Sequence, residues 1–362
     1  MAILVVGSVH ADARLGVGRL PRPGETVIAA AYTFGLGGKG ANQAVAAARG
    51  GALVRMIGAV GADANGVSAI AALRAEGVDV SLVRTCADAL TGMAMVAVEA
   101  AGENLIVVAP GADAAVTPET LSELAAGPGG WPGAEVTLCQ GELPADAVDR
   151  AAALAKSAGS AFVLNLAPVI DVAPETLALA DPLVMNEHEA GEVAAWFLAG
   201  GDSGGSDLVG CWEGVGTDPV GVEEGVALGQ RGLAAGPVAG ALAARRFVDQ
   251  ALAAGMSRSI VVTLGAAGAV AGAGALSAWG QAAAFRAVSG TAVEVADTTG
   301  AGDAFVGQLV AGLARGVSFR DAVAGGVAAG SLAVARAGAC ASYATAVEIE
   351  CFVRSIEVGE PR

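Results

Sequence analysis

Short apolar runs alternate along the chain with alanine-rich helical patterns. The runs are rich in β-branched residues and are bounded by glycine or polar residues, which is typical of buried strands in a parallel sheet. We expect strands at residues 3–7, 54–61, 135–141, 161–167, 182–187 and 259–265. Helices are expected at 40–50 and 66–77, and a hairpin at 93–100 and 104–109. This alternation predicts an α/β fold whose mostly parallel sheet is covered on both faces.

One segment departs from this rhythm. Residues from about 200 to 240 are rich in Gly, Asp and Glu, which predicts an inserted loop in an otherwise single domain over 1–362.

The uncharged run 260–285 is long enough for a membrane span, but its glycines and polar residues argue against one. The opening "MAILVVGSVH" lacks a basic region before its apolar run, so we interpret it as a first strand and expect no signal peptide.

Composition excludes some classes of function. The chain has 36 acidic and 20 basic residues, and this net charge of −16 argues against a nucleic-acid or anionic-membrane surface. Its five cysteines are scattered without a CxxC pair, and its two histidines are far apart, so we expect reduced thiols and no zinc site. We therefore expect a cytoplasmic protein with neither nucleic acid nor membrane as partner.

The stretch "ADTTGAGDAF" (296–305) opens an apolar pattern near the C-terminus. After Thr299, the spacing of Phe305, Leu309 and Leu313 predicts an amphipathic helix that ends at Gly316. Residues too small to carry side-chain chemistry therefore form the first turn of this helix, where backbone amides have no partner within the helix.

This helix start is suited to an anion. Gly300, Ala301 and Gly302 would offer free amides and the positive end of the helix dipole to charge developing on a transferring phosphoryl group. Asp303, at the same place, could accept the proton of an attacking hydroxyl. Judged on this motif alone, the alternative that Asp303 only stabilises the helix dipole is equally open.

A second glycine cluster, "GLGGKG" (35–40), matches the dinucleotide pattern GxGxxG, although it does not follow the first strand. A nucleotide-dependent oxidoreductase using this motif is thus the alternative from a different class. The longer stretch "GGKGANQA" (37–44) puts Lys39 and Asn42 on a glycine turn that opens a helix, which suits the binding of hydroxyl groups. Other polar residues follow predicted strands, where ligands of such sheets bind: Asp12, Glu142 and Asn186.

Taken together, "GGKGANQAVAAA" (37–48) and "DTTGAGDAFVG" (297–307) resemble the two signatures of the ribokinase (PfkB) family of sugar kinases. The stretches "GSVHAD", "RPGET", "NEHE" and "VVTLGAAG" stand where that family has its counterparts, so the resemblance covers nearly the whole chain except 200–240. It implies a ribokinase-like three-layer α/β/α sandwich with a small β lid from about 13–35 and 90–109. It also implies a homodimer formed through such lids.

The resemblance also implies roles for individual residues. Asp303 would be the general base for the sugar hydroxyl, and the amides of Ala301, Gly302 and Asp303 would form the anion hole. Gly300 would belong to the same catalytic turn. Sugar hydroxyls would be bound by His10, Asp12, Gly38, Lys39, Gly40, Asn42 and Glu142. ATP would be bound by Asn186, Thr263, Leu264, Gly265, Ala266, Ala267, Gly268 and Gly302. Mg²⁺ would be bound through waters by Asn186 and Glu189. An activating K⁺ would be surrounded, largely through backbone carbonyls, by Asp297, Thr299, Ala333, Arg336, Gly338 and Ser342.

The expected sugar follows from the donors and acceptors of this set. Asp12 and Glu142 supply acceptors, whereas Lys39, Asn42 and the Gly38 amide supply donors, which suits a compact pentose. Aromatic residues are only 4% of the chain, which disfavours a stacked nucleobase. We expect D-ribose, phosphorylated on its primary hydroxyl by ATP. His10 stands where bacterial members often have Asn, so another sugar such as fructose, or a nucleoside such as adenosine, stays open. A sugar-binding protein without catalysis is disfavoured by the presence of Asp303.

Overall fold

The computed structural model describes residues 2–99, 104–199, 237–289 and 292–359. The turn of the predicted hairpin and residues 200–236 of the predicted insertion lie outside these ranges. The last residues of that predicted insertion, 237–240, belong to a helix instead, α8 (Pro237–Ala253).

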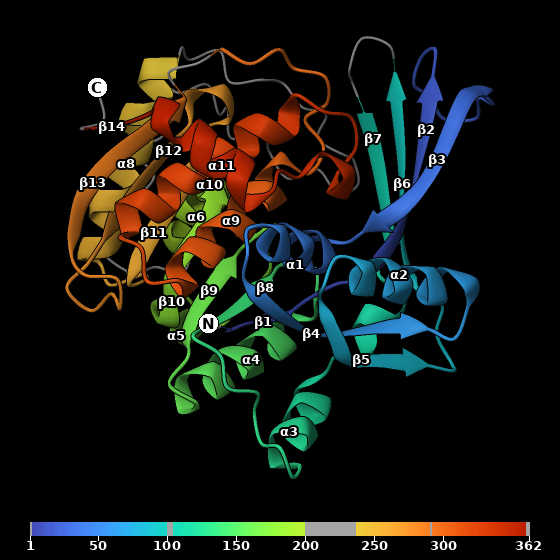
Figure 1. Cartoon of the computed structure of the whole chain (residues 1–362), viewed down its shortest axis with the longest axis horizontal. Coiled ribbons are helices and arrows are strands. Elements are labelled where there is room, and N and C mark those ends of the chain that lie inside the picture. Colours follow the sequence, from blue (N-terminus) through green and yellow to red (C-terminus); the bar gives the residue numbers. More distant parts are fainter. Residues whose placement is uncertain (1, 100–103, 200–236, 290–291, 360–362) are drawn as a thin grey trace.

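A ten-stranded sheet forms the centre of the molecule, in the order β14-β13-β12-β11-β10-β9-β8-β1-β4-β5 (Figure 1). Seven of its strands are parallel: β1 (Ala2–Val6), β4 (Leu53–Gly61), β5 (Asp79–Cys86), β8 (Val136–Gln140), β9 (Ala161–Asn165), β10 (Ala180–Asn186) and β11 (Ser259–Thr263). Three antiparallel strands extend one side: β12 (Ala269–Ala273), β13 (Ala282–Ser289) and β14 (Ile356–Gly359). The predicted mostly parallel sheet is confirmed.

Helices cover both faces of this sheet. Alternate residues of β1 enter two separate cores, Ile3 and Val5 on one face and Leu4 and Val6 on the other. The first core is completed by α1 (Lys39–Arg49), α2 (Ala64–Ala75), α9 (Ala301–Ala314), α10 (Phe319–Val334) and α11 (Ala346–Phe352). The second is completed by α3 (Pro118–Ala126), α4 (Ala145–Ser157), α5 (Pro174–Leu179), α6 (Glu187–Ala199) and α8. Burial on both faces explains why the parallel strands read as continuous apolar runs.

The uncharged run 260–285, for which the sequence argued against a membrane span, forms most of β11, all of β12 and the start of β13. Among the described residues, no helix combines the length and the apolar character that a membrane span requires.

A smaller four-stranded sheet, the lid, projects from one end of the large sheet (Figure 1). Its strands run in the order β3 (Ala29–Gly37), β2 (His10–Val17), β6 (Gly92–Glu99) and β7 (Asn104–Ala109). Side chains alternate across its two faces. One face carries His10, Asp12 and Arg14 of β2. The other carries Ala13 with its cross-strand partners Phe34 and Met95, which are 65% and 50% exposed.

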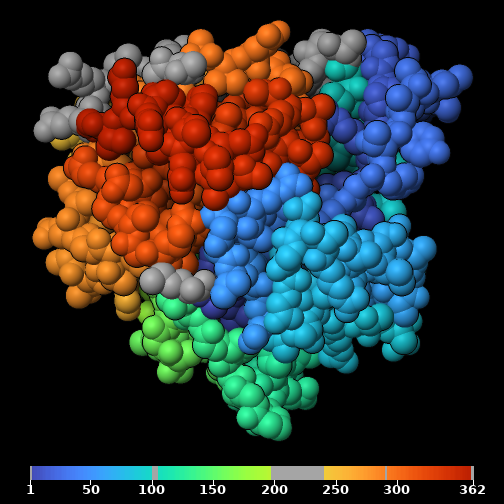
Figure 2. All heavy atoms as spheres, in the orientation of Figure 1, coloured from blue at the N-terminus to red at the C-terminus, as the bar shows by residue number. Residues whose placement is uncertain are grey.

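Helix α9 differs from its prediction in one respect. It begins at Ala301 and is followed by Gly316 with a positive φ, as expected, but residues 303–314 are all buried, so the helix is not amphipathic. Helices α1 and α10 pack against the sides that were expected to face water. The glycines of α9 allow this close packing. A Cβ at Gly307 would lie 2.4 Å from Ala46 Cβ of α1, so a larger residue would force the two helices apart. In Figure 2 the N-terminal and C-terminal parts of the chain, blue and red, meet on this side of the molecule.

Candidate active site

Polar residues gather where five neighbouring parallel strands end. In the order β11, β10, β9, β8 and β1, the strands end at or are followed by Thr263, Asn186, Asn165, Glu142 and Ser8. The starts of helices α1 and α9, which are rich in glycine and alanine, lie at the same edge. The edge therefore brings together the residues that the sequence placed in two distant motifs.

Asp303 lies at the centre of this edge. Its side chain is buried, and each carboxylate oxygen accepts a hydrogen bond from an amide of α1: Oδ2 from Asn42 Nδ2 at 3.0 Å, and Oδ1 from Gln43 Nε2 at 2.8 Å. Burial raises the pKa of Asp303, and the Lys39 charge and the two amide hydrogen bonds oppose that rise. The result is a fixed carboxylate with increased basicity at the start of α9.

Gln43 was not predicted as a site residue, although it connects Asp303 to the sheet. Besides Asp303, its Nε2 donates to Asn165 Oδ1 at 2.8 Å, and its Oε1 accepts from Gln140 Nε2 at 2.9 Å. Asn165 in turn donates to the Val184 carbonyl at 3.1 Å. The signal for Asn165 was available, because it is a polar residue near the end of the predicted apolar strand 161–167, as Asn186 is in the predicted strand 182–187.

The predicted glycine turn brings α1 against the end of β1. Gly38 has a positive φ of 84°, and a Cβ on Gly40 would lie 2.5 Å from the Gly7 carbonyl carbon, so both positions require glycine. Glu142 Oε2 accepts from the Lys39 amide at 2.8 Å and from Ser8 Oγ at 2.5 Å. The substrate-site candidates Gly38, Lys39, Gly40, Asn42 and Glu142 are thus brought together.

Lys39 provides positive charge at this edge. Burial lowers its pKa, but the carboxylates of Asp303, Glu142 and Glu189 outweigh burial, so the pKa of Lys39 is raised. The ammonium stays charged near neutral pH and is close enough to interact with all three acids. It therefore connects the predicted sugar site with the predicted magnesium motif.

The lid supplies His10 and Asp12. Asp12 was expected in a loop after the first strand but lies on β2, and its Oδ1 is buried with no hydrogen-bond partner among the described residues. Burial raises the pKa of Asp12 to about 6, helped by the charges of Glu142 and Asp303 and opposed by His10. A buried acceptor without a partner is costly and indicates a ligand that donates hydrogen bonds.

The His10 side chain, unlike Asp12 Oδ1, already has a hydrogen-bond partner. Its Nε2 pairs with Asp113 Oδ2 at 2.5 Å, and Asp113 Oδ1 accepts from the Val9 amide at 3.1 Å. Both side chains are buried. Burial lowers the pKa of His10. The hydrogen bond to Asp113 and the charge of Asp113 raise it by more, so the pKa of His10 is raised overall. Asp113 was not predicted as part of the site.

The predicted anion hole at the start of α9 is narrower than expected. Gly300 is the N-cap, with a φ of 75°, and the Ala301 amide donates to the Thr298 carbonyl at 3.3 Å. Within the described ranges no group accepts from the amides of Gly302 and Asp303, and a Cβ on Gly302 would have no atom within 4 Å. These two amides thus have no protein acceptor among the described residues, and they lie at the same helix start as the Asp303 carboxylate.

The predicted nucleotide residues form a tight turn after β11. Leu264 N donates to the Gly268 carbonyl at 2.8 Å, and Gly265–Ala267 form one turn of 3₁₀ helix. A Cβ on Gly268 would lie 2.0 Å from the Ala287 carbonyl oxygen, so only glycine fits there. Thr263 pairs in register with Asn186 of β10, which brings the turn next to the predicted magnesium residues.

Asn186 and Glu189 begin α6 and cap it reciprocally. Asn186 Oδ1 accepts from the amides of His188 and Glu189 at 2.9 and 2.8 Å, and Glu189 Oε2 accepts from the Asn186 amide at 2.8 Å. Burial raises the pKa of Glu189, against the hydrogen bond from Asn186 and the charge of Lys39. Glu189 Oε1 is left for a water of a hydrated cation, so this pair fits Mg²⁺ bound through waters.

The predicted K⁺ residues also lie together, before and after α9 and α10. Asp297 Oδ1 accepts from Thr299 N and Thr299 Oγ1 at 3.0 and 2.7 Å, and its Oδ2 accepts from Gly338 N at 2.9 Å. The Arg336 amide donates to Ala333 O at 3.1 Å, and Ser342 Oγ donates to Ala339 O at 2.7 Å. The remaining lone pair of Asp297 Oδ2 is taken by Arg14 Nη1 of the lid. A carboxylate offers about four such positions, so the Asp297 side chain, as arranged, has none left for a bare cation.

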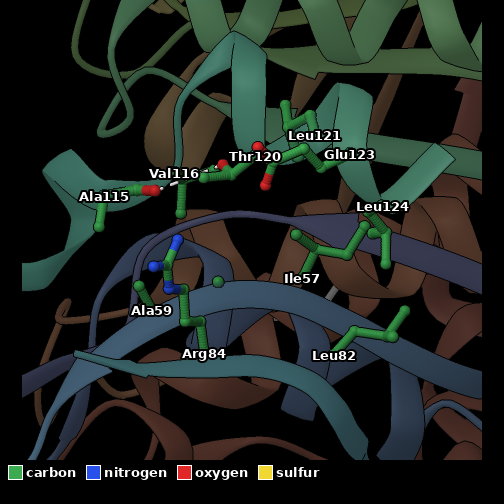
Figure 3. A pocket seen from close by; sticks show the side chains of 11 residues that line it. Ile57, Ala59, Leu82, Arg84, Ala115, Val116, Thr120, Leu121, Glu123 and Leu124 are labelled. Atoms are coloured by element: carbon green, nitrogen blue, oxygen red, sulfur yellow. Dashed lines mark hydrogen bonds between the residues drawn. The ribbon is translucent and has the colours of Figure 1, made fainter. Parts of the chain in front are cut away.

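A separate pocket of about 250 Å³ lies between β4, β5 and α3 (Figure 3). Ile57, Leu82 and Leu124 line it, and the Arg84 side chain borders one end. None of its lining residues belongs to the cluster around Asp303. We therefore do not place chemistry there.

Comparison with known proteins agrees with this geometry. Residues 2–196 and 239–346 match the model for the pfkB family carbohydrate kinases. A ribokinase of Haemophilus influenzae is 32% identical over 350 residues, 96% of either chain, and one of Schizosaccharomyces pombe is 30% identical over 359 residues, again 96% of either. The structure of a ribokinase of Cryptococcus neoformans in complex with ADP superposes with a TM-score of 0.72 at 28% identity, over 96% of this chain and 98% of that one.

The chain therefore belongs to the PfkB family of carbohydrate kinases and is a phosphotransferase. The predicted ribokinase-like fold with a small β lid is confirmed, and the lid has four strands. The alternative of an oxidoreductase loses its basis, because "GLGGKG" connects β3 of the lid to α1 and does not follow a strand of the large sheet.

Proposed function

We propose that the protein transfers the γ-phosphoryl group of ATP to the primary hydroxyl of D-ribose, which yields D-ribose 5-phosphate and ADP. The observation that carries this proposal is the buried Asp303 carboxylate, held by two amides beside the open amides of Gly302 and Asp303. The relatives named ribokinase and the ADP complex of one of them support the choice of sugar and nucleotide.

In this proposal Asp303 removes the proton of the ribose hydroxyl as its oxygen attacks the γ-phosphorus. The new P–O bond forms while the bond to the β-phosphate oxygen breaks, and ADP leaves with the electron pair. Negative charge on the γ-phosphoryl oxygens faces the amides of Gly302 and Asp303 and the start of α9. Lys39, charged and near both Asp303 and Glu189, stabilises the same charge.

Ribose binding is assigned to the lid and to the start of α1. Asp12 Oδ1 lacks a partner and is suited to accept from a sugar hydroxyl, while the Asn42 and Lys39 side chains supply donors. His10 is already paired with Asp113, so we assign it to shaping the site and not to a direct contact through Nε2. The hydroxyl-rich ligand would satisfy polar groups that the protein leaves unpaired.

Mg²⁺ is proposed to be bound by Glu189 through waters, with Asn186 holding that carboxylate in place. When bound, the ion would neutralise negative charge on the phosphates of ATP. The nucleotide itself is assigned to the turn from Thr263 to Gly268, whose glycines permit a close approach of the backbone.

The substrate is tested by ATP turnover with a panel of sugars and nucleosides. We expect kcat/KM for D-ribose to exceed that for D-fructose and adenosine by at least about tenfold, because the wrong ligand leaves buried groups unpaired. Coupled detection of ADP gives the rates. If a hexose or a nucleoside gives the highest kcat/KM, the ribose assignment is wrong and the family assignment stands.

The general base is tested by Asp303→Asn. This change keeps the shape of the side chain but removes its basicity, so turnover should fall by roughly 10²–10⁴ while ribose binding persists. Asp321→Asn is the matched control, because Asp321 also lies in the first turn of a helix but is exposed. Near-normal turnover of Asp303→Asn would reduce Asp303 to a helix-stabilising role.

The raised pKa of Asp12 predicts an acid limb in the pH profile. Asp12 is ionised above about pH 6 and protonated below it, so kcat/KM for the sugar should fall as the pH drops through about 6. An ordinary aspartate would titrate near pH 4. Asp12→Asn should lower kcat/KM at pH 7.5 and move this limb. A limb that stays unchanged in Asp12→Asn would assign it to another group.

We also propose a homodimer formed through the outer face of the lid. Tyr32 and Phe34, 70% and 65% exposed, contact each other edge to face at 5.7 Å, and Met95 and Val107 extend the same face. Such an apolar face indicates a partner, and a second lid is complementary to it.

Phe34→Asp should convert the dimer to a monomer, because it puts a charge in the apolar contact. The control Leu276→Asp should leave the dimer intact, because Leu276 is 81% exposed in a loop outside the lid. Light scattering after size exclusion gives the mass. A monomeric natural protein at micromolar concentration would contradict the proposed dimer.

A further inference from the structure

The lid contributes one side chain to the loop that precedes α9. Arg14 lies on the same face of β2 as Asp12, two residues further along the strand. Its Nη1 donates to Asp297 Oδ2 and, at 3.1 Å, to Thr299 Oγ1. The Arg14 side chain is 33% exposed and that of Asp297 is 6% exposed, so this ion pair is largely removed from water.

Asp297 holds the loop in place and needs a positive partner. Its largely buried carboxylate accepts hydrogen bonds from Gly338 N, Thr299 and Arg14 Nη1, and such bonds favour the charged form. The amides of Ala296 and Asp297 donate to Val334 O at the end of α10, at 2.8 and 3.1 Å. The negative end of a helix therefore adds to the charge of the carboxylate.

The family resemblance assigned this position to a dissolved K⁺. The arrangement of donors disagrees, since Thr299 N, Thr299 Oγ1, Gly338 N and Arg14 Nη1 occupy the lone pairs of the Asp297 carboxylate. A dissolved ion would first have to displace a tethered guanidinium from a largely buried acid.

We propose that Arg14 supplies from within the chain the single positive charge that orders the loop 297–302, so that phosphoryl transfer does not require a dissolved monovalent cation. This inference rests on the proposed function. Arg14 is a positioning residue, because it acts on the reaction through Asp297 and Thr299, which lead directly into the N-cap Gly300 and the open amides beyond it.

The arrangement also links sugar binding to the phosphate side of the site. Asp12 and Arg14 belong to one strand and one face, so a lid held by sugar at Asp12 also holds Arg14 at Asp297. A dissolved ion has no such connection to the sugar. The loop with the anion hole would thus be ordered most firmly when the acceptor hydroxyl is bound.

The test replaces the charge and asks whether an ion can restore it. Turnover of the natural protein, of Arg14→Met and of the control Arg19→Met is measured in KCl, NaCl and tetramethylammonium chloride at one ionic strength. Arg19 is a suitable control because it follows the same strand and pairs with Glu25 on the surface. The natural protein and Arg19→Met should vary by less than about twofold between salts.

Arg14→Met should lose activity by roughly 10–100-fold in tetramethylammonium, because the loop amides are displaced, and recover with saturating K⁺. Thermal unfolding provides a readout apart from activity: K⁺ should raise the Tm of Arg14→Met but not that of the natural protein. Turnover absent in all proteins, with these Tm shifts present, would refute the proposed function alone.

Two outcomes would overturn the inference. If K⁺ activates the natural protein and Arg14→Met with the same dependence, the ion binds beside Arg14 and the charge of the arginine is not its substitute. If Arg14→Met folds but is inactive in every salt and its Tm does not respond to K⁺, Arg14 has a role that no simple cation replaces.

Discussion

The burial of one carboxylate between two helices from opposite ends of the chain is the constraint on which the site depends. Among the described residues Asp303 of α9 forms no direct ion pair, and its carboxylate accepts hydrogen bonds from two side-chain amides of α1, Asn42 and Gln43. These donors are correctly placed only if α1 and α9 pack closely, and that packing requires Gly307. The small residues of both motifs thus serve the carboxylate as much as they serve a ligand.

The hydrogen-bond network behind Asp303 consists of uncharged amide side chains. Gln43, Gln140 and Asn165 connect the carboxylate to three elements through hydrogen bonds between neutral groups. Such a network fixes position without stabilising the anion as strongly as an arginine would. Burial therefore keeps the pKa of Asp303 raised against these amides and the Lys39 charge, which suits a group that must accept a proton.

Sequence patterns predicted the parts of this molecule that depend on local order. Continuous apolar runs marked the buried parallel strands, and the helix start at Gly300 followed from its glycines. The burial of α9 on all sides was missed, because period alone does not reveal that α1 and α10 cover its outer faces. Gln43, Asp113 and Arg14 were missed for a related reason. Arg14 is 283 positions from Asp297, and in sequence it resembles any charged residue of an exposed strand.

The pair of His10 and Asp113 has a consequence for how this protein can change over time. The two side chains meet in a buried place and form a hydrogen bond at 2.5 Å. Replacing either one alone leaves the other as a buried polar group without its partner, which is strongly destabilising. Positions 10 and 113 are therefore expected to vary together among relatives, and a lineage could pass from asparagine to histidine at position 10 only with a matching change a hundred residues away.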